Sequence, residues 1–293
     1  MNKHAFLIIA HEHFSILELL LSQLDHERND IYLHIDRKCG RIDESRFRNC
    51  CRKSRLVFIP RRRVYWGHSS LSECELDLIQ AAVDSGETYD YYHLLSGTDL
   101  QIRSMAEIHR FFDEHPDRQF IAPRKLESGL GGMDRYYFFL PLRAYSRVLS
   151  KGLDIVSLWL QKLFHVHRLK KWRGTKMMKC QQWFSITAPF AEYVLKERDF
   201  IHRFIRFTSC SDEMFLGTVL INSPFYRQMT HHSALYGHLR LIDRERPEKA
   251  SPHTWTIDDW EMIEKTPNCF WARKFNEERD PDVIRKVAET WPN

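Results

Sequence analysis

Two adjacent carboxylates, Asp212 and Glu213, lie between a short polar segment and an apolar run. Acids in the first turn of a helix stabilise the helix by about 0.3–1 kcal/mol through its dipole. Alternatively, one of the two carboxylates is a general base beside a cleft and takes the proton of a hydroxyl as that oxygen attacks. The spacing alone leaves both interpretations open.

Two cations, Arg273 and Lys274, lie between the aromatic residues Phe270, Trp271 and Phe275. Cations framed in this way are expected to be partly buried, and a buried charge needs a partner of opposite sign. A diphosphate is such a partner, because basic side chains hold its oxygens through charge-assisted hydrogen bonds. No acid stands beside the pair in sequence, although an ion pair formed across the fold would meet the same need.

Other polar residues lie where four predicted strands end. Ligands bind at the carboxyl ends of strands in an open α/β sheet, so these ends are expected to form one crevice for a nucleotide or a sugar. Polar residues of this kind also suit ordinary turns. Neither GxGxxG nor GxxxxGK[ST] is present, so the pattern is not that of a dinucleotide site or a P-loop. The candidates are His11, His34, Asp36, Trp66, Gly67, Ser96 and Asp99.

The elements that must position these groups alternate along the first 125 residues. Apolar runs predict strands over 4–10, 31–35, 56–59, 89–95 and 119–122. Helical spacing predicts helices over 14–24, 70–82 and 105–112. This alternation indicates an α/β fold with a mostly parallel central sheet flanked by helices. Farther on, we expect a flexible break at 128–132, a polar approach to a short strand at 180–187 and a helix at 189–197.

Composition narrows the class of protein. The chain has 293 residues, 43% hydrophobic and 28% charged, which is a globular balance. Its net charge of +5 is too small to indicate a nucleic-acid partner. No apolar run reaches the roughly 20 residues of a membrane-spanning helix. Seven cysteines without a CxxC pair fit neither a zinc site nor a disulfide framework.

The segment 142–179 is strongly basic. From Arg143 to Lys179 it holds ten basic residues and one acid, Asp154, around an apolar stretch at 153–164. An apolar helix flanked by lysine and arginine is typical of a segment that lies on an anionic membrane surface. A core helix followed by a solvated basic loop is the alternative interpretation.

Several short motifs, taken in order, resemble those of one enzyme family. They are KHAFLIIAH at 3–11, YLHID at 32–36, YWGHS at 65–69, YYHLLSGTD at 91–99, QW at 182–183, DE at 212–213, PHTW at 252–255 and ARKF at 272–275. In this set the chain resembles the core-2/I-branching β-1,6-N-acetylglucosaminyltransferases, glycosyltransferase family 14, which also contains the peptide xylosyltransferases. The resemblance runs from about Lys3 to Ile284.

The resemblance implies a GT-A-like fold in a single domain over 1–293. Its parts are a nucleotide-sugar-binding half (1–125), a basic amphipathic insertion (142–179) and an acceptor and catalytic half (180–293). The implied reaction is an inverting, metal-independent transfer of a sugar, N-acetylglucosamine by preference, from a UDP-sugar to a glycan hydroxyl. No metal or other cofactor is implied, and the only Asp-x-Asp string, at 280–282, lies at the start of the terminal helix.

Site residues carry over by motif. Glu213 matches the family's catalytic base, while Lys274 and Arg240 match cations that stabilise the UDP leaving group. Nucleotide-sugar contacts are implied for His11, His34, Asp36, Trp66, Gly67, Ser96, Asp99, Arg240, Arg273 and Lys274. Acceptor contacts are implied for Asp212, Gln182, Trp183 and Trp255.

The chain departs from animal members of the family, which carry a membrane anchor, a stem and disulfides. We therefore expect a bacterial-type cytoplasmic enzyme of surface-polysaccharide synthesis, attached peripherally to the inner face of the plasma membrane and acting on a lipid-linked glycan. The segment 142–179 matches no motif of the family and is expected to provide the attachment. The alternatives are a UDP-xylose or other UDP-hexose transferase, a metal-dependent transferase, and a non-catalytic protein that binds nucleotide sugars or glycans.

Overall fold

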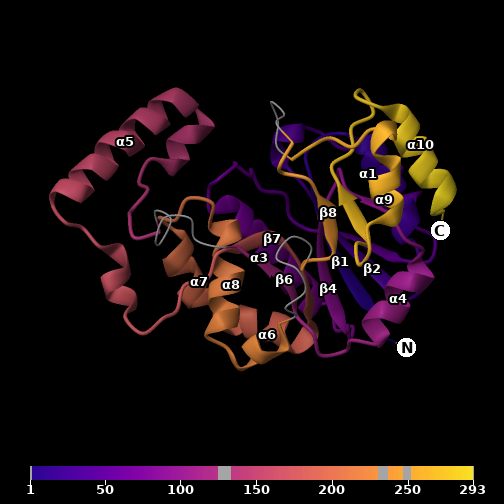
Figure 1. The fold of residues 1–293 in the computed structure, drawn as a ribbon, viewed down its shortest axis with the longest axis horizontal. Coiled ribbons are helices and arrows are strands. Elements are labelled where there is room, and N and C mark those ends of the chain that lie inside the picture. Colours follow the sequence, from indigo (N-terminus) through magenta and orange to yellow (C-terminus); the bar gives the residue numbers. More distant parts are fainter. Residues whose placement is uncertain (1, 125–132, 230–236, 247–251, 293) are drawn as a thin grey trace.

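A computed structural model describes residues 2–124, 133–229, 237–246 and 252–292. The flexible break expected at 128–132 lies outside the described residues. Figure 1 shows a central sheet with helices on both sides and one helix, α5 (Arg147–Leu163), held apart from them. No helix among the described residues has the length and hydropathy that a membrane span requires.

Six strands form the central sheet, and four of them are joined by parallel pairing. The first four along the chain pair in parallel, and the last two add an antiparallel extension at one side. The predicted α/β architecture with a mostly parallel central sheet flanked by helices is thus confirmed. In spatial order the strands are β3 (Arg55–Phe58), β2 (Asn29–Ile35), β1 (His4–Ala10), β4 (Tyr91–Ser96), β7 (Cys180–Thr187) and β6 (Phe120–Pro123).

Helices bury both faces of this sheet because successive side chains of its strands point to opposite sides. In β1, Phe6 and Ile8 belong to one core cluster, while Ala5 and Leu7 belong to the other. The first cluster is covered by α1 (Phe14–Leu24), α2 (Glu44–Arg48), α4 (Met105–Asp113), α9 (Trp260–Lys265) and α10 (Pro281–Thr290). The second is covered by α3 (Ser70–Val83), α6 (Ala188–Lys196), α7 (Arg198–Ile205) and α8 (Phe215–Ile221).

A second, three-stranded sheet brings the C-terminal part of the chain to the end of β4. Its order is β5 (Leu100–Gln101), β9 (Trp271–Arg273) and β8 (Arg240–Ile242). The sequence did not predict these strands, since runs of two or three residues carry too few positions to show a period. Because β5 follows β4 directly, the Arg273–Lys274 pair is carried to the same edge as the β4 carboxyl end.

Three expectations differ from the structure. The strand β7 fills all of 180–187, because pairing with both β4 and β6 extends it over its polar start. The carboxylates Asp212 and Glu213 lie in a short 3-10 turn, η4 (Ser211–Glu213), and the α-helix begins only at Phe215. The core-helix interpretation of 153–164 is wrong, since most large apolar side chains of α5 are exposed.

The ends of β1 and β4 approach each other closely at Gly97. The amide of Gly97 donates to Ile9 O at 3.0 Å, and a Cβ built on Gly97 would lie only 2.7 Å from Ala10 Cβ. That separation is well below van der Waals contact between two carbons. A residue without a side chain is therefore required where these strands deliver their following loops.

The Gly97→Ala substitution is expected to lower the free energy of unfolding by about 1–3 kcal/mol, because the backbone must shift to relieve the clash. Urea unfolding followed by circular dichroism measures the change. The matched control is Gly152→Ala in α5, where a new Cβ meets nothing within 4 Å and alanine has the higher helix propensity. A Gly97→Ala protein as stable as the control would contradict the prediction.

Candidate active site

The carboxyl ends of β1, β2 and β4 meet at one edge of the sheet because these strands are parallel. Backbone hydrogen bonds tie the ends together: Asp36 N donates to Ala10 O at 2.9 Å, and Gly97 N donates to Ile9 O at 3.0 Å. His11, Asp36 and Asp99 therefore leave the sheet at the same edge, which we call the catalytic edge.

Asp36 organises the loops at this edge. Its side chain is buried and accepts hydrogen bonds from the amides of Lys38 at 2.8 Å and Val64 at 3.3 Å, and Lys38 Nζ lies 3.3 Å away. His11 is exposed beside it. Partial desolvation lowers the pKa of His11, and the positive charge of Arg273 acts in the same direction. The residue that follows β1 and the C-terminal cation Arg273 thus lie close together.

Asp99 and Arg273 form the polar contact at the centre of the catalytic edge. Arg273 Nη1 donates to Asp99 Oδ1 at 2.9 Å, and the amide of Ser96 donates to Asp99 Oδ2 at 2.9 Å. Burial raises the pKa of Asp99, while Arg273 opposes that rise. The guanidinium also lies over the Trp183 ring, 4.6 Å from its centroid. Arg273 therefore forms an ion pair across the fold, with Asp99, which is the alternative that the sequence had left open.

Lys274 differs from its neighbour. Its backbone oxygen accepts from Trp255 N at 3.0 Å, which holds the chain just after β9, but the side chain of this half-buried residue has no hydrogen bond or ion pair within the described part of the chain. A cation in this state is available to an incoming anion. Trp255 itself is fully buried, so its ring packs in the core beneath the edge and its acceptor role stays a prediction.

Arg240 is also fully buried, below the catalytic edge. Its guanidinium donates to Ser185 Oγ at 2.8 Å, to Phe184 O at 2.7 Å and to Leu94 O at 3.1 Å. Burial lowers its pKa to about 9. It joins the strands β4, β7 and β8 from inside, so the structure does not bring it to the surface where Lys274 lies.

His34 and Ser96 likewise support the edge from within. His34 lies inside β2, its Nε2 accepts from Arg62 N at 3.0 Å, and burial lowers its pKa to about 4. The hydroxyls of Ser96 and Thr98 are 3.0 Å apart and shape the turn that leads to Asp99. Contact of either predicted residue with a ligand stays untested.

Glu213 is held at the catalytic edge by two cations. Its Oε2 lies 3.1 Å from Lys179 Nζ, and its Oε1 lies 3.7 Å from Arg124 Nη1. Arg124 directly follows β6 and Lys179 directly precedes β7, and Arg124 N donates to Lys179 O at 2.9 Å. Since β6 runs antiparallel to β7 and β7 antiparallel to β4, these residues lie at the carboxyl end of β4.

Asp212 points inward, away from these cations. Its Oδ1 is buried without a hydrogen-bond partner among the described residues, as is Oε2 of the neighbouring Glu75. Burial and the charge of Glu213 raise the pKa of Asp212 to about 7. Burial and the charge of Asp212 raise the pKa of Glu75 well above its usual range. Gln182 Nε2 donates to Glu75 Oε1 at 2.9 Å, so the side chain of Gln182 hydrogen-bonds one of these two buried acids.

The loop after β3 reaches the same place. The amide of Cys210 donates to Gly67 O at 3.1 Å, one residue before the turn that carries Glu213. Gly67 has a φ of +69°, a conformation that favours glycine. Trp66, next to it, is 74% exposed. This loop therefore offers a free aromatic surface beside the carboxylate.

Sequence reasoning missed three basic residues of the catalytic edge: Arg124, Lys179 and Arg244. Arg244 is exposed just after β8, and its pKa is lowered by desolvation and by Arg124 and Arg273, while Glu213 raises it. Each of the three directly flanks a strand end or lies two residues beyond one. The positions of Arg124 and Lys179 near predicted strand ends could be read from the sequence. The antiparallel pairing that brings these residues together could not.

The Asp212→Asn substitution tests the buried acid. With a folded pKa near 7 against an ordinary 3.8, Asp212 keeps its proton in the folded chain over a range where the unfolded chain has lost it. The wild-type free energy of unfolding should therefore fall as pH rises from about 5 to 7, by up to about 1.4 kcal/mol per pH unit from this group. Urea unfolding at both pH values should show Asp212→Asn gaining stability relative to wild type over that interval.

The control for this experiment is Asp258→Asn, which removes an exposed carboxylate. Its stability should follow the wild-type pH dependence. Equal pH dependence in wild type and Asp212→Asn would show that Asp212 is ionised throughout the interval.

Comparison with known proteins shows what the chain is similar to. The chain is 26% identical to xylosyltransferase 2 of Rattus norvegicus over 309 residues, covering 96% of this chain and 32% of that protein. It is 24% identical to the β-glucuronosyltransferase GlcAT14B of Arabidopsis thaliana over 295 residues, covering 93% and 62% respectively. The chain thus spans about a third of the length of the xylosyltransferases that it matches.

A solved structure is also similar. The crystal structure of mouse xyloside xylosyltransferase 1, apo form, superposes with a TM-score of 0.41 at 9% identity, covering 93% of this chain and 97% of that one. The sequence profile of the Core-2/I-Branching enzymes matches residues 4–268, which is most of the chain and includes Glu213. The chain therefore belongs to the Core-2/I-Branching enzyme family.

Proposed function

We propose that this chain is an inverting, metal-independent glycosyltransferase that moves a sugar from a UDP-sugar to a hydroxyl of a glycan acceptor. One observation carries the proposal: a carboxylate, Glu213, and a cation without a partner among the described residues, Lys274, belong to one edge of the sheet. Family membership and relatives named xylosyltransferase and glucuronosyltransferase support it.

Glu213 is the proposed general base. In an inverting transfer the acceptor oxygen attacks the anomeric carbon and loses its proton to a carboxylate, while the bond from that carbon to the diphosphate oxygen breaks. Lys179 and Arg124 hold the Glu213 carboxylate at the edge instead of letting it fold inward. The neighbouring Asp212 is buried, so it is the less suitable of the two carboxylates.

Basic side chains are proposed to stabilise the departing diphosphate. Charge that develops on the leaving oxygen needs donors placed in advance, and lysine and arginine provide them without a divalent ion. Lys274 is the main candidate, with Arg244 and Arg273 beside it. Arg240 is buried in this structure, so it places no positive charge at the surface. Its proposed contribution is to hold the strand on which the other basic residues depend.

The donor sugar and the acceptor complete the proposal. N-acetylglucosamine is the favoured sugar, and the names of the relatives put UDP-xylose and UDP-glucuronic acid next to it. The proposed setting is bacterial surface-polysaccharide synthesis in the cytoplasm, on a glycan acceptor linked to a lipid. A non-catalytic sugar-binding protein is the rival function, and turnover separates the two.

The Glu213→Gln substitution should reduce turnover by about a hundredfold to ten-thousandfold, because amide nitrogen and oxygen cannot take the acceptor proton. A thermal-shift screen of UDP-sugars first identifies the donor, and a UDP-release assay then measures the rate. The thermal shift produced by UDP should persist in the variant.

Glu192→Gln is the control for this loss, since it makes the same replacement of a carboxylate oxygen by an amide nitrogen at an exposed glutamate on α6. It should keep the wild-type rate. Retained turnover in Glu213→Gln would assign the base to another residue, and absence of turnover in wild type with every donor would favour the sugar-binding protein.

The Lys274→Ala substitution should lower kcat/KM for the donor by about a hundredfold, as loss of one preorganised donor to a developing anion does. EDTA should leave the wild-type rate unchanged. Lys196→Ala, which removes an exposed lysine of α6, is the control. Loss of the wild-type rate in EDTA and its return with manganese would overturn the metal-independent mechanism.

A further inference from the structure

The helix α5 (Arg147–Leu163) turns polar residues inward. Ser150 and Gln161 are buried, Ser150 Oγ donates to Phe139 O at 2.8 Å, and Gln161 bonds the backbone N and O of Tyr136, each at 2.8 Å. Hydrogen bonds therefore fasten this helix to the protein. Its apolar side chains are left to face outward.

The outward face of α5 is apolar along its whole length. Val148, Ile155, Trp159 and Leu163 recur at spacings of seven and four, which place them on one side of a helix. Val148 is 85% exposed and Trp159 is 62% exposed, and Phe164, just after the helix, is 72% exposed. Figure 1 shows α5 apart from the helices that cover the sheet. A contiguous apolar surface of this kind marks an interaction site.

The exposed charges of the segment 143–179 that surround this face are positive. Asp154, the only acid between residues 143 and 179, is 5% exposed and lies on the inward side. Exposed basic residues flank the apolar face on α5 and on the segment after it. They are Lys151, Lys162, Lys170, Lys171, Arg173 and Lys176.

Two hollows adjoin this face. A groove of about 410 Å³ runs beneath α5 and is lined mainly by apolar side chains, Phe138 among them. A pocket of about 330 Å³ lies between η3 (Arg168–Trp172) and the end of α7. Phe138 lines the groove and Phe207 lines the pocket. The centroids of their rings are 5.3 Å apart, so the groove and the pocket are neighbours.

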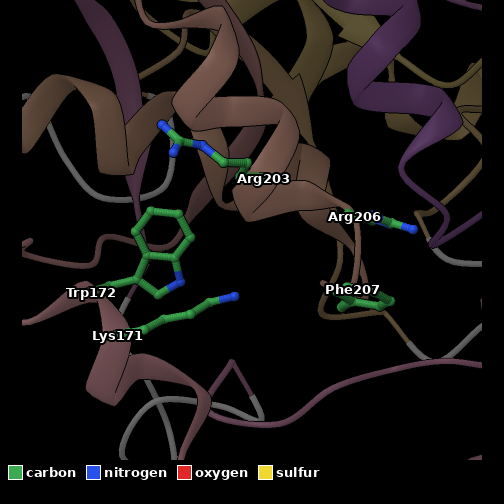
Figure 2. Close-up of a pocket in the computed structure, with 5 residues that line it drawn as sticks. All are labelled: Lys171, Trp172, Arg203, Arg206 and Phe207. Atoms are coloured by element: carbon green, nitrogen blue, oxygen red, sulfur yellow. The ribbon is translucent and has the colours of Figure 1, made fainter.

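The pocket is basic and aromatic. Figure 2 shows Lys171 and Trp172 from η3 on one side and three residues from α7 and its end on the other. No acid lines it among the described residues. The lining residues are Lys171, Trp172, Arg203, Arg206 and Phe207.

We propose that α5, the groove and the pocket together form a docking surface for a bilayer that contains anionic phospholipids. The apolar face of α5 enters the boundary between headgroups and acyl chains, where tryptophan is favoured, and the flanking lysines contact lipid phosphates. The pocket receives one such phosphate. A second copy of the chain fits less well, because a self-complementary contact on α5 would bring Lys151 and Lys162 of both copies together.

Flotation with vesicles tests the proposal. The full chain should float with vesicles of phosphatidylcholine and phosphatidylglycerol but not with phosphatidylcholine alone. Trp159→Ser should weaken binding by about tenfold, through lost apolar burial. Lys162→Ala and Lys170→Ala should each weaken it by about fivefold at low salt. Donor and acceptor are absent, so the outcome is independent of the proposed reaction.

The matched controls are Tyr226→Ser, an exposed aromatic outside this surface, and Lys265→Ala on α9. Both should bind like wild type, and urea unfolding checks that every variant is folded. Equal flotation with neutral and anionic vesicles, or unchanged binding by Trp159→Ser, would overturn the proposal. So would a lipid-free dimer that dissociates in Trp159→Ser, because a second copy would then cover α5.

Discussion

The buried carboxylate of Asp99 is the contact on which the catalytic edge depends. It closes the turn after β4 through the amide of Ser96 and receives Arg273 from the C-terminal strand β9. A buried charge of this kind is costly unless it is paired, so docking of the small sheet, which brings Arg273 to Asp99, stabilises the turn after β4. Lys274 follows Arg273 directly and reaches the edge as a result.

A line of buried polar groups crosses the sheet beneath that edge. His4 Nδ1 lies 2.9 Å from His93 Nε2, His93 Nδ1 lies 2.8 Å from Ser185 Oγ, and Arg240 donates to the same hydroxyl. Burial lowers the pKa of both histidines, so they act as neutral hydrogen-bonding groups. This line links β1, β4, β7 and β8, and it explains why a motif-matched arginine lies inside the protein.

Sequence patterns predicted the strands and longer helices of the parallel half of the fold to within one or two residues, because long apolar runs and helical spacing decide those elements locally, whereas the short helix α2 was not predicted. Strands were also predicted near β6 and β7, but their antiparallel pairing and the short strands β8 and β9 depend on contacts between distant segments, which no local pattern records. For the same reason Glu213 could be picked out as a candidate, while its partners Arg124 and Lys179 could not. Arg240 and Trp255 were predicted to contact a ligand, and the structure shows that both are buried, which no local pattern indicated.

One backbone hydrogen bond, from Cys210 N to Gly67 O, joins the loop after β3 to the turn that carries Glu213. The first of these segments presents Trp66 to solvent, and the second carries the Glu213 carboxylate, whose side chain is 16% exposed. A shift of the backbone at Gly67 would therefore act through this amide on the residue that precedes the Ser211–Glu213 turn.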